Sequence, residues 1–213
     1  KGMTTLTKEQ SNRLLEEAFN SGCFEFYYLE LTTGLRLGEI LALEWEDLDV
    51  KNKTLSITKQ VQRIDGTLRA ETPKTKNSIR TIAISSDCAT ALAKLKMRQA
   101  KGTTLMFPSP ETGTYRDQNA VTRKFKRMLR RAGLPQEVRF HDLRHTCATI
   151  ALEEGVEIKA LSSMLGHSDV AFTMNTYVHA TKKLKTTAAD KMEAAFQIGY
   201  SSVMNVECQL MNA

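Results

Sequence analysis

Residues 24–43 read FEFYYLELTTGLRLGEILAL and contain two apolar helical segments that are divided by a glycine. The spacing of the apolar residues predicts a helix over residues 24–33. This helix should end at Gly34, because glycine readily takes the left-handed conformation that closes many helices. A second helix is predicted from about Leu37 to Leu43. Both segments are apolar enough to be core elements, so we expect the fold to be built around them.

The segment that precedes them predicts a helix with a capping box. Thr7 at the N-cap position is followed three residues later by Gln10. Apolar residues then recur at helical spacing at positions 14, 15, 18 and 19, and Gly22 is expected to end the helix.

The pattern changes from helix to strand after Trp45. Asp65-Gly66 is a strong short signal for a β-hairpin, with strands predicted over residues 61–64 and 67–72. A polar turn over residues 73–78 leads to a third strand over residues 79–84. Its two faces are Ile79, Thr81 and Ala83 on one side and Arg80, Ile82 and Ile84 on the other. The sequence therefore predicts a small antiparallel sheet of three strands.

Helices return after the third strand. Ser85 or Ser86 caps one that carries Leu92 and Leu95, and Asp117 caps a second, strongly basic one. Each of Gly133, Gly155 and Gly166 falls just past a helical pattern. The expected fold is therefore mainly α with a small three-stranded antiparallel β-sheet, in the α+β class.

The composition is that of a globular protein with a basic excess. Of 213 residues, 41% are hydrophobic and 25% charged, and no apolar run approaches the roughly 18 residues that span a bilayer. A signal-peptide pattern is absent, so we expect no membrane partner. The four cysteines are far apart, without a CxxC pair, which favours a reducing, cytoplasmic setting.

The positive charge is concentrated in one segment. The formal net charge is +6, and residues 116–144 hold nine Lys or Arg against three acids, which accounts for the whole excess. Such a concentration indicates a polyanionic partner, usually nucleic acid, although a solvated helix face would look the same.

Five short segments of the sequence belong together: TGLRLGEI at 33–40, TPKTK at 72–76, HDLRH at 141–145, LGHS at 165–168 and NTY at 175–177. Their order and spacing closely resemble the catalytic domain of the tyrosine recombinases, specifically the phage and conjugative-transposon integrases. Each segment is weak evidence by itself, and the ordered set is strong evidence. The resemblance covers about residues 4–182.

The resemblance implies that Arg36 and Arg144 clamp the phosphate that is cleaved. A guanidinium suits this role because it offers paired donors to phosphate and keeps its charge. Glu39 matches an acidic position that supports the active site in the family. As an i,i+3 partner of Arg36, it would act through the same ion pair in any helical protein.

The same resemblance assigns the remaining catalytic roles. Tyr177 would be the nucleophile, His141 would transfer protons and His167 would contact the phosphate. Lys74 would be the general acid on the departing 5′ oxygen, and Lys76, two residues away, is the alternative for that role.

The implied reaction cleaves and rejoins DNA through a 3′-phosphotyrosyl intermediate, without ATP, a metal or another cofactor. It would integrate or excise a mobile element. The implied partners are double-stranded DNA at attachment sites, further copies of the chain in a tetrameric synapse, and accessory DNA-bending or excision factors. A bacterial, cytoplasmic and nucleoid-associated location follows from this role.

Three alternatives remain open. A type IB topoisomerase would use similar chemistry to relax single duplexes, and a silent DNA-binding relative would lack a member of the active set. A zinc-dependent hydrolase would use His141 and His145, which are spaced i,i+4 as in HExxH, although Asp142 replaces the glutamate.

The basic helix that begins at Asp117 has no catalytic duty in this interpretation. We expect it to contact backbone phosphates, which position a protein without reading sequence. The residues assigned to this contact are Arg123, Lys124, Arg127 and Arg130.

The catalytic domain is expected to span residues 1–181, followed by a linker and tail helix over residues 182–213. The family usually places a DNA-binding domain ahead of this one, so we expect the chain to be a C-terminal fragment. A short amphipathic tail must bury its apolar face on something. By resemblance it docks on a neighbouring protomer, and packing on its own domain is the alternative.

Overall fold

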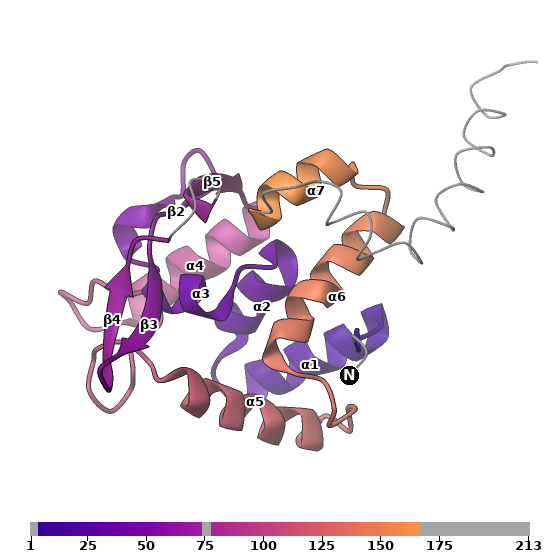
Figure 1. Ribbon diagram of the computed structural model, residues 1–213, viewed down its shortest axis with the longest axis horizontal. Helices are drawn as coiled ribbons and strands as arrows, with labels where there is room; N and C mark the ends of the chain where they lie inside the picture. The colour runs from indigo at the N-terminus through magenta and orange to yellow at the C-terminus, as the bar shows by residue number, and fades with distance from the viewer. Residues whose placement is uncertain (1–3, 74–77, 167–213) are drawn as a thin grey trace, which may run out of the picture.

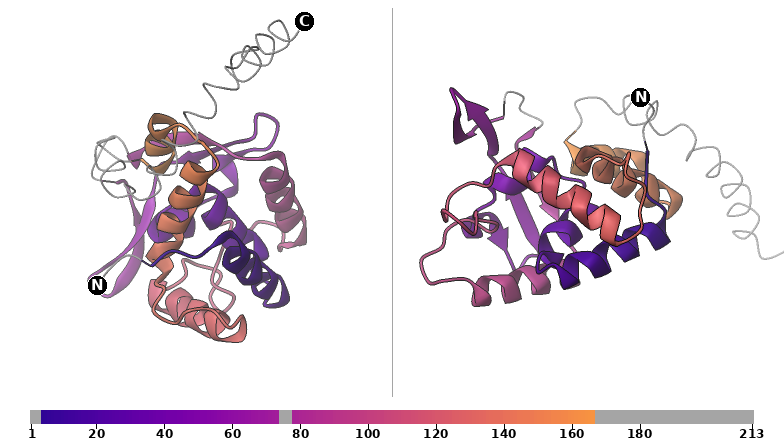
Figure 2. Two further views of the ribbon diagram at one scale, coloured as in Figure 1. Left: turned by 90° about the vertical axis from the view of Figure 1, so that its right-hand side faces the viewer. Right: turned by 90° about the horizontal axis from the view of Figure 1, so that it is seen from below.

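The computed structural model describes residues 4–73 and 78–166 (Figure 1). Its helices are α1 (Lys8–Asn20), α2 (Phe24–Thr33), α3 (Leu37–Ala42), α4 (Ser86–Arg98), α5 (Gln118–Arg131), α6 (Phe140–Glu153) and α7 (Ile158–Leu165), with a short 3-10 helix at Trp45–Asp47. The apolar helix α2 lies among α1, α4 and α6 and packs against all three. Figure 2 shows α5 alongside α1 at the edge of this group.

Aromatic side chains join α2 to the helices around it. Phe26 and Tyr27 of α2 are both buried. The Phe125 ring of α5 lies 5.7 Å from the Phe140 ring of α6, and 6.0 Å from that of Tyr27, between ring centroids. Because buried aromatic residues remove large apolar areas from water, this cluster accounts for much of the attachment of α5 and α6 to the centre.

The predicted helix ends are confirmed. The Thr7 hydroxyl accepts from the Gln10 backbone N–H at 3.2 Å, and the Gln10 side chain accepts from the Thr7 N–H at 2.9 Å. Of the two serines proposed to cap α4, Ser85 does so, and Asp117 caps α5. The glycines at 22, 34, 133, 155 and 166 all have positive φ.

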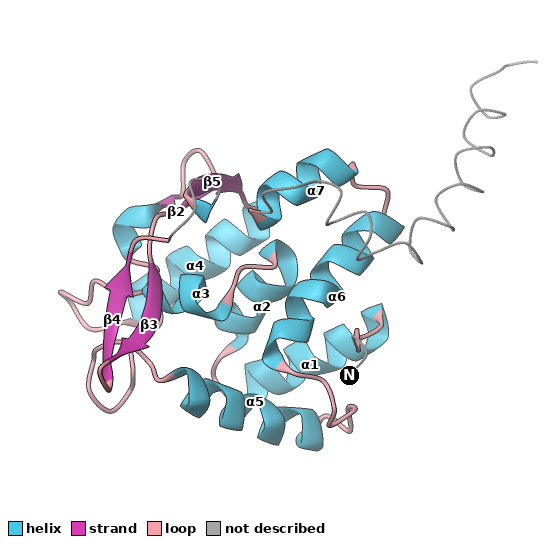
Figure 3. Cartoon of the chain, in the orientation of Figure 1, coloured by secondary structure: helices cyan, strands magenta, loops and turns pink. Residues whose placement is uncertain are grey.

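The strands form two small antiparallel sheets. One has the order β1-β2-β5, from Leu48–Asp49, Thr54–Ile57 and Arg80–Ala83. The other is the hairpin of β3 (Gln60–Ile64) and β4 (Thr67–Glu71), which turns at Asp65-Gly66 as predicted and lies beside α3 (Figure 3).

The expected pairing of the third strand was wrong. The sequence pattern predicted one sheet that joins the hairpin and the third strand, whereas β5 pairs with β2 and the hairpin forms a sheet of its own. Burial explains the difference, since Ile82 of β5 lies opposite Leu55 of β2 and both are buried. No residue of β4 is buried, so β4 offers β5 no buried apolar partner.

No helix within residues 4–73 and 78–166 has both the length and the apolar content needed to cross a bilayer.

Gly34 brings the end of α2 into direct contact with α6 and α7. Its φ is +62°, and a Cβ at this position would lie 2.7 Å from Leu165 Cδ2 and 3.3 Å from Cys147 Sγ. Two separate constraints therefore favour glycine at this position: the left-handed backbone conformation and the close approach of the two helices.

Replacing Gly34 with alanine should destabilise the protein more than replacing Gly22, which serves as the matched control. Gly22 has φ +64°, and no atom lies within 4 Å of the place that an added Cβ would take. Both changes should cost about 1 kcal/mol for the left-handed conformation. Gly34→Ala should cost at least about 1 kcal/mol more, because Leu165 must move. Urea unfolding measures both values, and equal losses would contradict the close packing.

Candidate active site

Arg144 of α6 joins the ends of two other helices. Its side chain is buried, and Nη1 donates to the Gly34 carbonyl at 2.6 Å while Nη2 donates to the Leu165 carbonyl at 2.7 Å. Burial first, and then the nearby Arg36 charge, lowers the pKa of Arg144 to about 10. The guanidinium therefore keeps its charge at neutral pH, although burial disfavours that charge.

Arg36 lies at the N-cap of α3 and is held by Glu39 one turn later. Its backbone N–H donates to Glu39 Oε2 at 2.9 Å, and its Nη1 donates to Glu39 Oε1 at 2.8 Å. The Arg36 side chain is 36% exposed, whereas that of Glu39 is 1% exposed. A buried carboxylate thus orients a guanidinium that solvent, or a ligand, can reach.

Arg80 of β5 holds the same carboxylate from the other side, a role that was not predicted from the sequence. Its Nη1 and Nη2 donate to the two oxygens of Glu39 at 3.1 and 3.0 Å. Burial raises the pKa of Glu39, but the hydrogen bonds and charge of Arg80, and then of Arg36, outweigh it and hold this pKa below its ordinary value. The available signal was the position of Arg80 on the same strand face as the buried Ile82 and Ile84.

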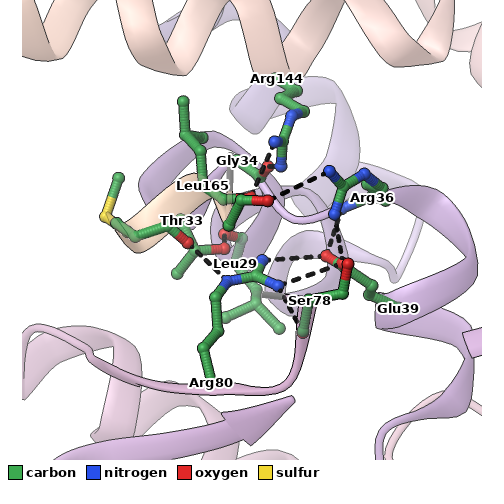
Figure 4. A network of polar contacts seen from close by, with 11 residues as sticks. Leu29, Thr33, Gly34, Arg36, Glu39, Ser78, Arg80, Arg144 and Leu165 are labelled. Carbon is green, nitrogen blue, oxygen red and sulfur yellow. Dashed lines mark hydrogen bonds and ion pairs between the residues drawn. The ribbon is translucent and has the colours of Figure 1, made fainter. Parts of the chain in front are cut away.

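The three arginines meet at the C-terminal end of α7 (Figure 4). Three consecutive carbonyls there accept one hydrogen bond each: Met164 from Arg80 Nε at 2.8 Å, Leu165 from Arg144 at 2.7 Å and Gly166 from Arg36 at 3.4 Å. These carbonyls lie at the negative end of the helix dipole, which favours cations.

His141 lies at the exposed start of α6, close enough to Arg144 and Arg36 to feel their charges. Partial burial of the ring first, and then the Arg144 charge, lowers the pKa of His141. The imidazole is therefore largely neutral at pH 7 and can accept a proton.

The His145 ring contacts the His141 ring edge to face, with centroids 4.9 Å apart. Burial and the neighbouring His141 lower the pKa of His145 to about 4. Within residues 4–73 and 78–166, no three His, Cys, Asp or Glu side chains gather as a metal site would require.

Glu30 of α2 is a second buried acid, also missed from the sequence. It has no exposed surface, and neither carboxyl oxygen has a hydrogen-bond partner within the described residues. Burial raises its pKa well above the ordinary value, opposed by the charge of Arg144. Glu30 and His141 both line a cavity of about 410 Å³, which also borders Gln118 and Thr122 of α5.

The structure brings together four of the residues singled out from the sequence: Arg36, Glu39, His141 and Arg144. Lys74, Lys76, His167 and Tyr177 lie outside the described residues, as does the tail over residues 182–213.

The four basic residues assigned to phosphate contact lie on α5 and differ in their surroundings. Arg123, Arg127 and Arg130 are exposed. The Lys124 ammonium donates to the Ser21 carbonyl at 3.3 Å, so it is partly engaged within the protein.

The arrangement can bind an anion. Within the described residues, Glu39 is the one carboxylate in ion-pair contact with Arg36 and Arg80, and Arg144 contacts none. Three guanidiniums with one contacting carboxylate leave an excess of positive charge at a partly exposed site. Two of them, Arg36 and Arg144, approach from different helices, which suits a tetrahedral oxyanion.

Comparison with known proteins shows the family to which the chain belongs. The pattern of the phage integrase family matches residues 4–183. The chain is 34% identical over 213 aligned residues to the tyrosine recombinase XerC-like protein of Caldanaerobacter subterraneus subsp. tengcongensis, covering 90% of this chain and 54% of the relative. It is 30% identical to the ICEBs1 integrase of Bacillus subtilis (strain 168), covering 79% and 48%. The chain thus spans about half the length of these relatives.

Solved structures share the fold. The Tn1549 transposon integrase in complex with a circular intermediate DNA matches with a TM-score of 0.75 at 23% identity, covering 83% of this chain and 62% of that one. The XerA recombinase matches with a TM-score of 0.70 at 23% identity, covering 87% and 63%.

Replacing Glu30 with glutamine should stabilise the protein increasingly as pH rises. Above the ordinary carboxyl pKa of 4.5, the folded chain keeps a proton on Glu30 that the unfolded chain releases. Stability therefore falls as pH rises between the unfolded and the folded pKa, and glutamine removes this loss. Urea unfolding from pH 4 to 8 measures the difference. Glu16→Gln, on the exposed side of α1, is the control for loss of a surface carboxylate, and a Glu30→Gln effect that is constant with pH would contradict a protonated Glu30.

Proposed function

Because the chain belongs to the phage integrase family, we propose that it is the catalytic part of a tyrosine-type site-specific DNA recombinase. The observation that carries the proposal is the paired clamp of Arg36 and Arg144. Both guanidiniums donate to adjacent carbonyls at the end of α7. Arg36 shares its carboxylate partner, Glu39, with Arg80, and Arg144 contacts no carboxylate within the described residues. A DNA phosphodiester is the anion that such a pair fits.

The clamp would stabilise the transition state of phosphoryl transfer. Attack on the phosphodiester places extra negative charge on the non-bridging oxygens, and donors fixed in advance lower its energy without reorganising. Arg144 is fixed by two carbonyls, and Arg36 by Glu39. A guanidinium that burial has stripped of water interacts more strongly with a phosphate than one in bulk water.

The remaining residues carry out the cleavage of the phosphodiester and its proton transfers. The Tyr177 phenol oxygen attacks phosphorus, the bond from phosphorus to the 5′ oxygen breaks, and the product is a 3′-phosphotyrosine with a 5′ hydroxyl. Neutral His141 accepts the phenol proton, and Lys74, with Lys76 as the alternative, protonates the departing oxygen. His167 donates to the phosphate.

The substrate in this proposal is double-stranded DNA at the attachment sites of a mobile element, which the enzyme integrates or excises. The name of the ICEBs1 integrase supports this substrate class, as does the transposon right end DNA bound to the Tn1549 transposon integrase. Strand exchange between two sites requires several copies of the chain, for which we propose a tetramer with accessory DNA-bending or excision factors, on the bacterial nucleoid. The tail over residues 182–213 would follow the catalytic domain and dock on a neighbouring copy.

Tyr177→Phe should abolish the covalent protein–DNA adduct and leave duplex binding nearly unchanged, because only the attacking hydroxyl is lost. The substrate is a set of nicked duplexes tiled across the ends of the mobile element that carries the gene. Denaturing gels detect the adduct, and Tyr28→Phe on α2 is the control.

Three outcomes of this trapping experiment would argue against the proposal. An adduct on the Phe variant would move the nucleophile elsewhere. A wild-type chain that forms no adduct on any duplex would refute the recombinase. A wild-type chain that relaxes single supercoiled plasmids but does not exchange strands between two sites would favour the topoisomerase alternative.

Neutralising the basic face of α5 should weaken binding to all duplex sequences alike. Each lost phosphate contact should reduce the slope of log K against log salt by about 0.9. The changes, all to glutamine, are at Arg123, Lys124, Arg127 and Arg130. A control variant that removes three charges from α4, with Lys94, Lys96 and Arg98 changed to glutamine, should bind as the wild type does. An unchanged slope in the α5 variant would mean that α5 is only a solvated surface.

A further inference from the structure

We propose that Arg80 is a positioning residue for the phosphate clamp, which holds Glu39 so that Arg36 keeps its charge and direction toward the phosphate. The inference rests on the proposed function and adds a residue to it. Arg80 would act through Glu39 and α7, without touching DNA.

The exposure of the three side chains separates their tasks. The side chain of Arg36 is 36% exposed, that of Arg80 is 8% exposed and that of Glu39 is 1% exposed. Glu39 lies between the two arginines and contacts both (Figure 4). A ligand can therefore reach Arg36, whereas the Arg80 side chain is largely buried and contacts other groups of the protein.

The hydrogen bonds of Glu39 show why one arginine would not suffice. Oε1 accepts from Arg36 Nη1 at 2.8 Å and from Arg80 Nη1 at 3.1 Å. Oε2 accepts from the Arg36 backbone N–H at 2.9 Å and from Arg80 Nη2 at 3.0 Å. Each carboxylate oxygen thus has two donors, and the buried acid is fully satisfied.

Charge balance gives Arg80 a function in binding. If Arg36 were the sole partner of Glu39, the pair would be neutral and Arg36 would have little net charge to offer an anion. With Arg80 present, the three groups carry one net positive charge, and the exposed end of that charge is Arg36. Arg80 therefore supplies the charge that Arg36 presents.

Arg80 also fixes the clamp in space. Its Nε donates to the Met164 carbonyl at 2.8 Å, and the next carbonyl, that of Leu165, accepts from Arg144. Strand pairing sets the position of Arg80 itself, since it lies opposite Ile57 in the β2–β5 register. One side chain thus ties β5 to α7 and to Glu39 of α3, so both clamp arginines share one frame.

The test compares single-turnover adduct formation and duplex affinity of the full chain from pH 5 to 9. The variants are Arg80→Gln, Glu39→Gln and their double, and Arg98→Gln, which breaks the surface ion pair with Glu25, is the control. Arg80→Gln should slow adduct formation roughly 10- to 100-fold, a range typical for loss of a supporting hydrogen-bond partner, and change duplex affinity less than the rate.

The pH profile distinguishes positioning from general structural support. Without Arg80, burial dominates and the pKa of Glu39 rises, so the rate should acquire a new fall as pH decreases toward 5. The wild-type rate should fall only as His141 is protonated, without this second acid limb. The double variant should lose the limb again, because glutamine does not titrate, and should be no slower than Glu39→Gln alone.

Three results would overturn the inference while wild-type adduct formation upholds the proposed function. These are a wild-type rate in Arg80→Gln, a slower rate with an unchanged pH profile, and a double variant whose losses simply multiply. If Arg80→Gln fails to fold, the Arg80→Lys variant tests the inference in its place. Lysine keeps the charge but cannot span both oxygens, so it should slow adduct formation, and a wild-type rate would overturn the role. A wild type without any adduct refutes the proposed function and this inference together.

Discussion

The C-terminal end of α7 is the feature on which the site depends. The last carbonyls of any helix lack partners within it and carry partial negative charge. Here three successive carbonyls are satisfied by arginines from β5, α6 and the start of α3. Those three elements are far apart in sequence, so the same contacts that complete α7 also set the relative positions of the groups that would bind phosphate.

Burying these cations costs stability, and the structure offsets the cost only in part. Backbone carbonyls accept hydrogen bonds from Arg144, but no carboxylate contacts it within the described residues. Burial raises the pKa of the nearby Glu30, which favours the neutral form of that acid. Such a site becomes more stable when an anion binds, because the anion supplies the negative charge that the buried arginines lack within the fold. Activity and stability therefore make opposite demands on the same residues, as is usual where charge is arranged in advance.

Local patterns in the sequence predicted local structure well. The capping box at Thr7, the Asp65-Gly66 turn and the glycine at the end of α2 each depend on a few neighbouring residues, and all three are confirmed. The partner of β5 depends on a contact between Ile82 and Leu55, which the alternation of one strand does not encode. Arg80 and Glu30 were missed for the same reason, since their importance comes from what folds against them. Arg36 and Arg144, 108 positions apart in the sequence, were paired only through the family resemblance.

A crystal structure of the Tyr177→Phe chain bound to its uncleaved duplex tests the central claim most directly. We expect the phosphate at the cleavage position to accept hydrogen bonds from both Arg36 and Arg144, with Arg80 still paired to Glu39 and out of contact with DNA. A phosphate bound by Arg80, or one that lies away from the end of α7, would contradict the account.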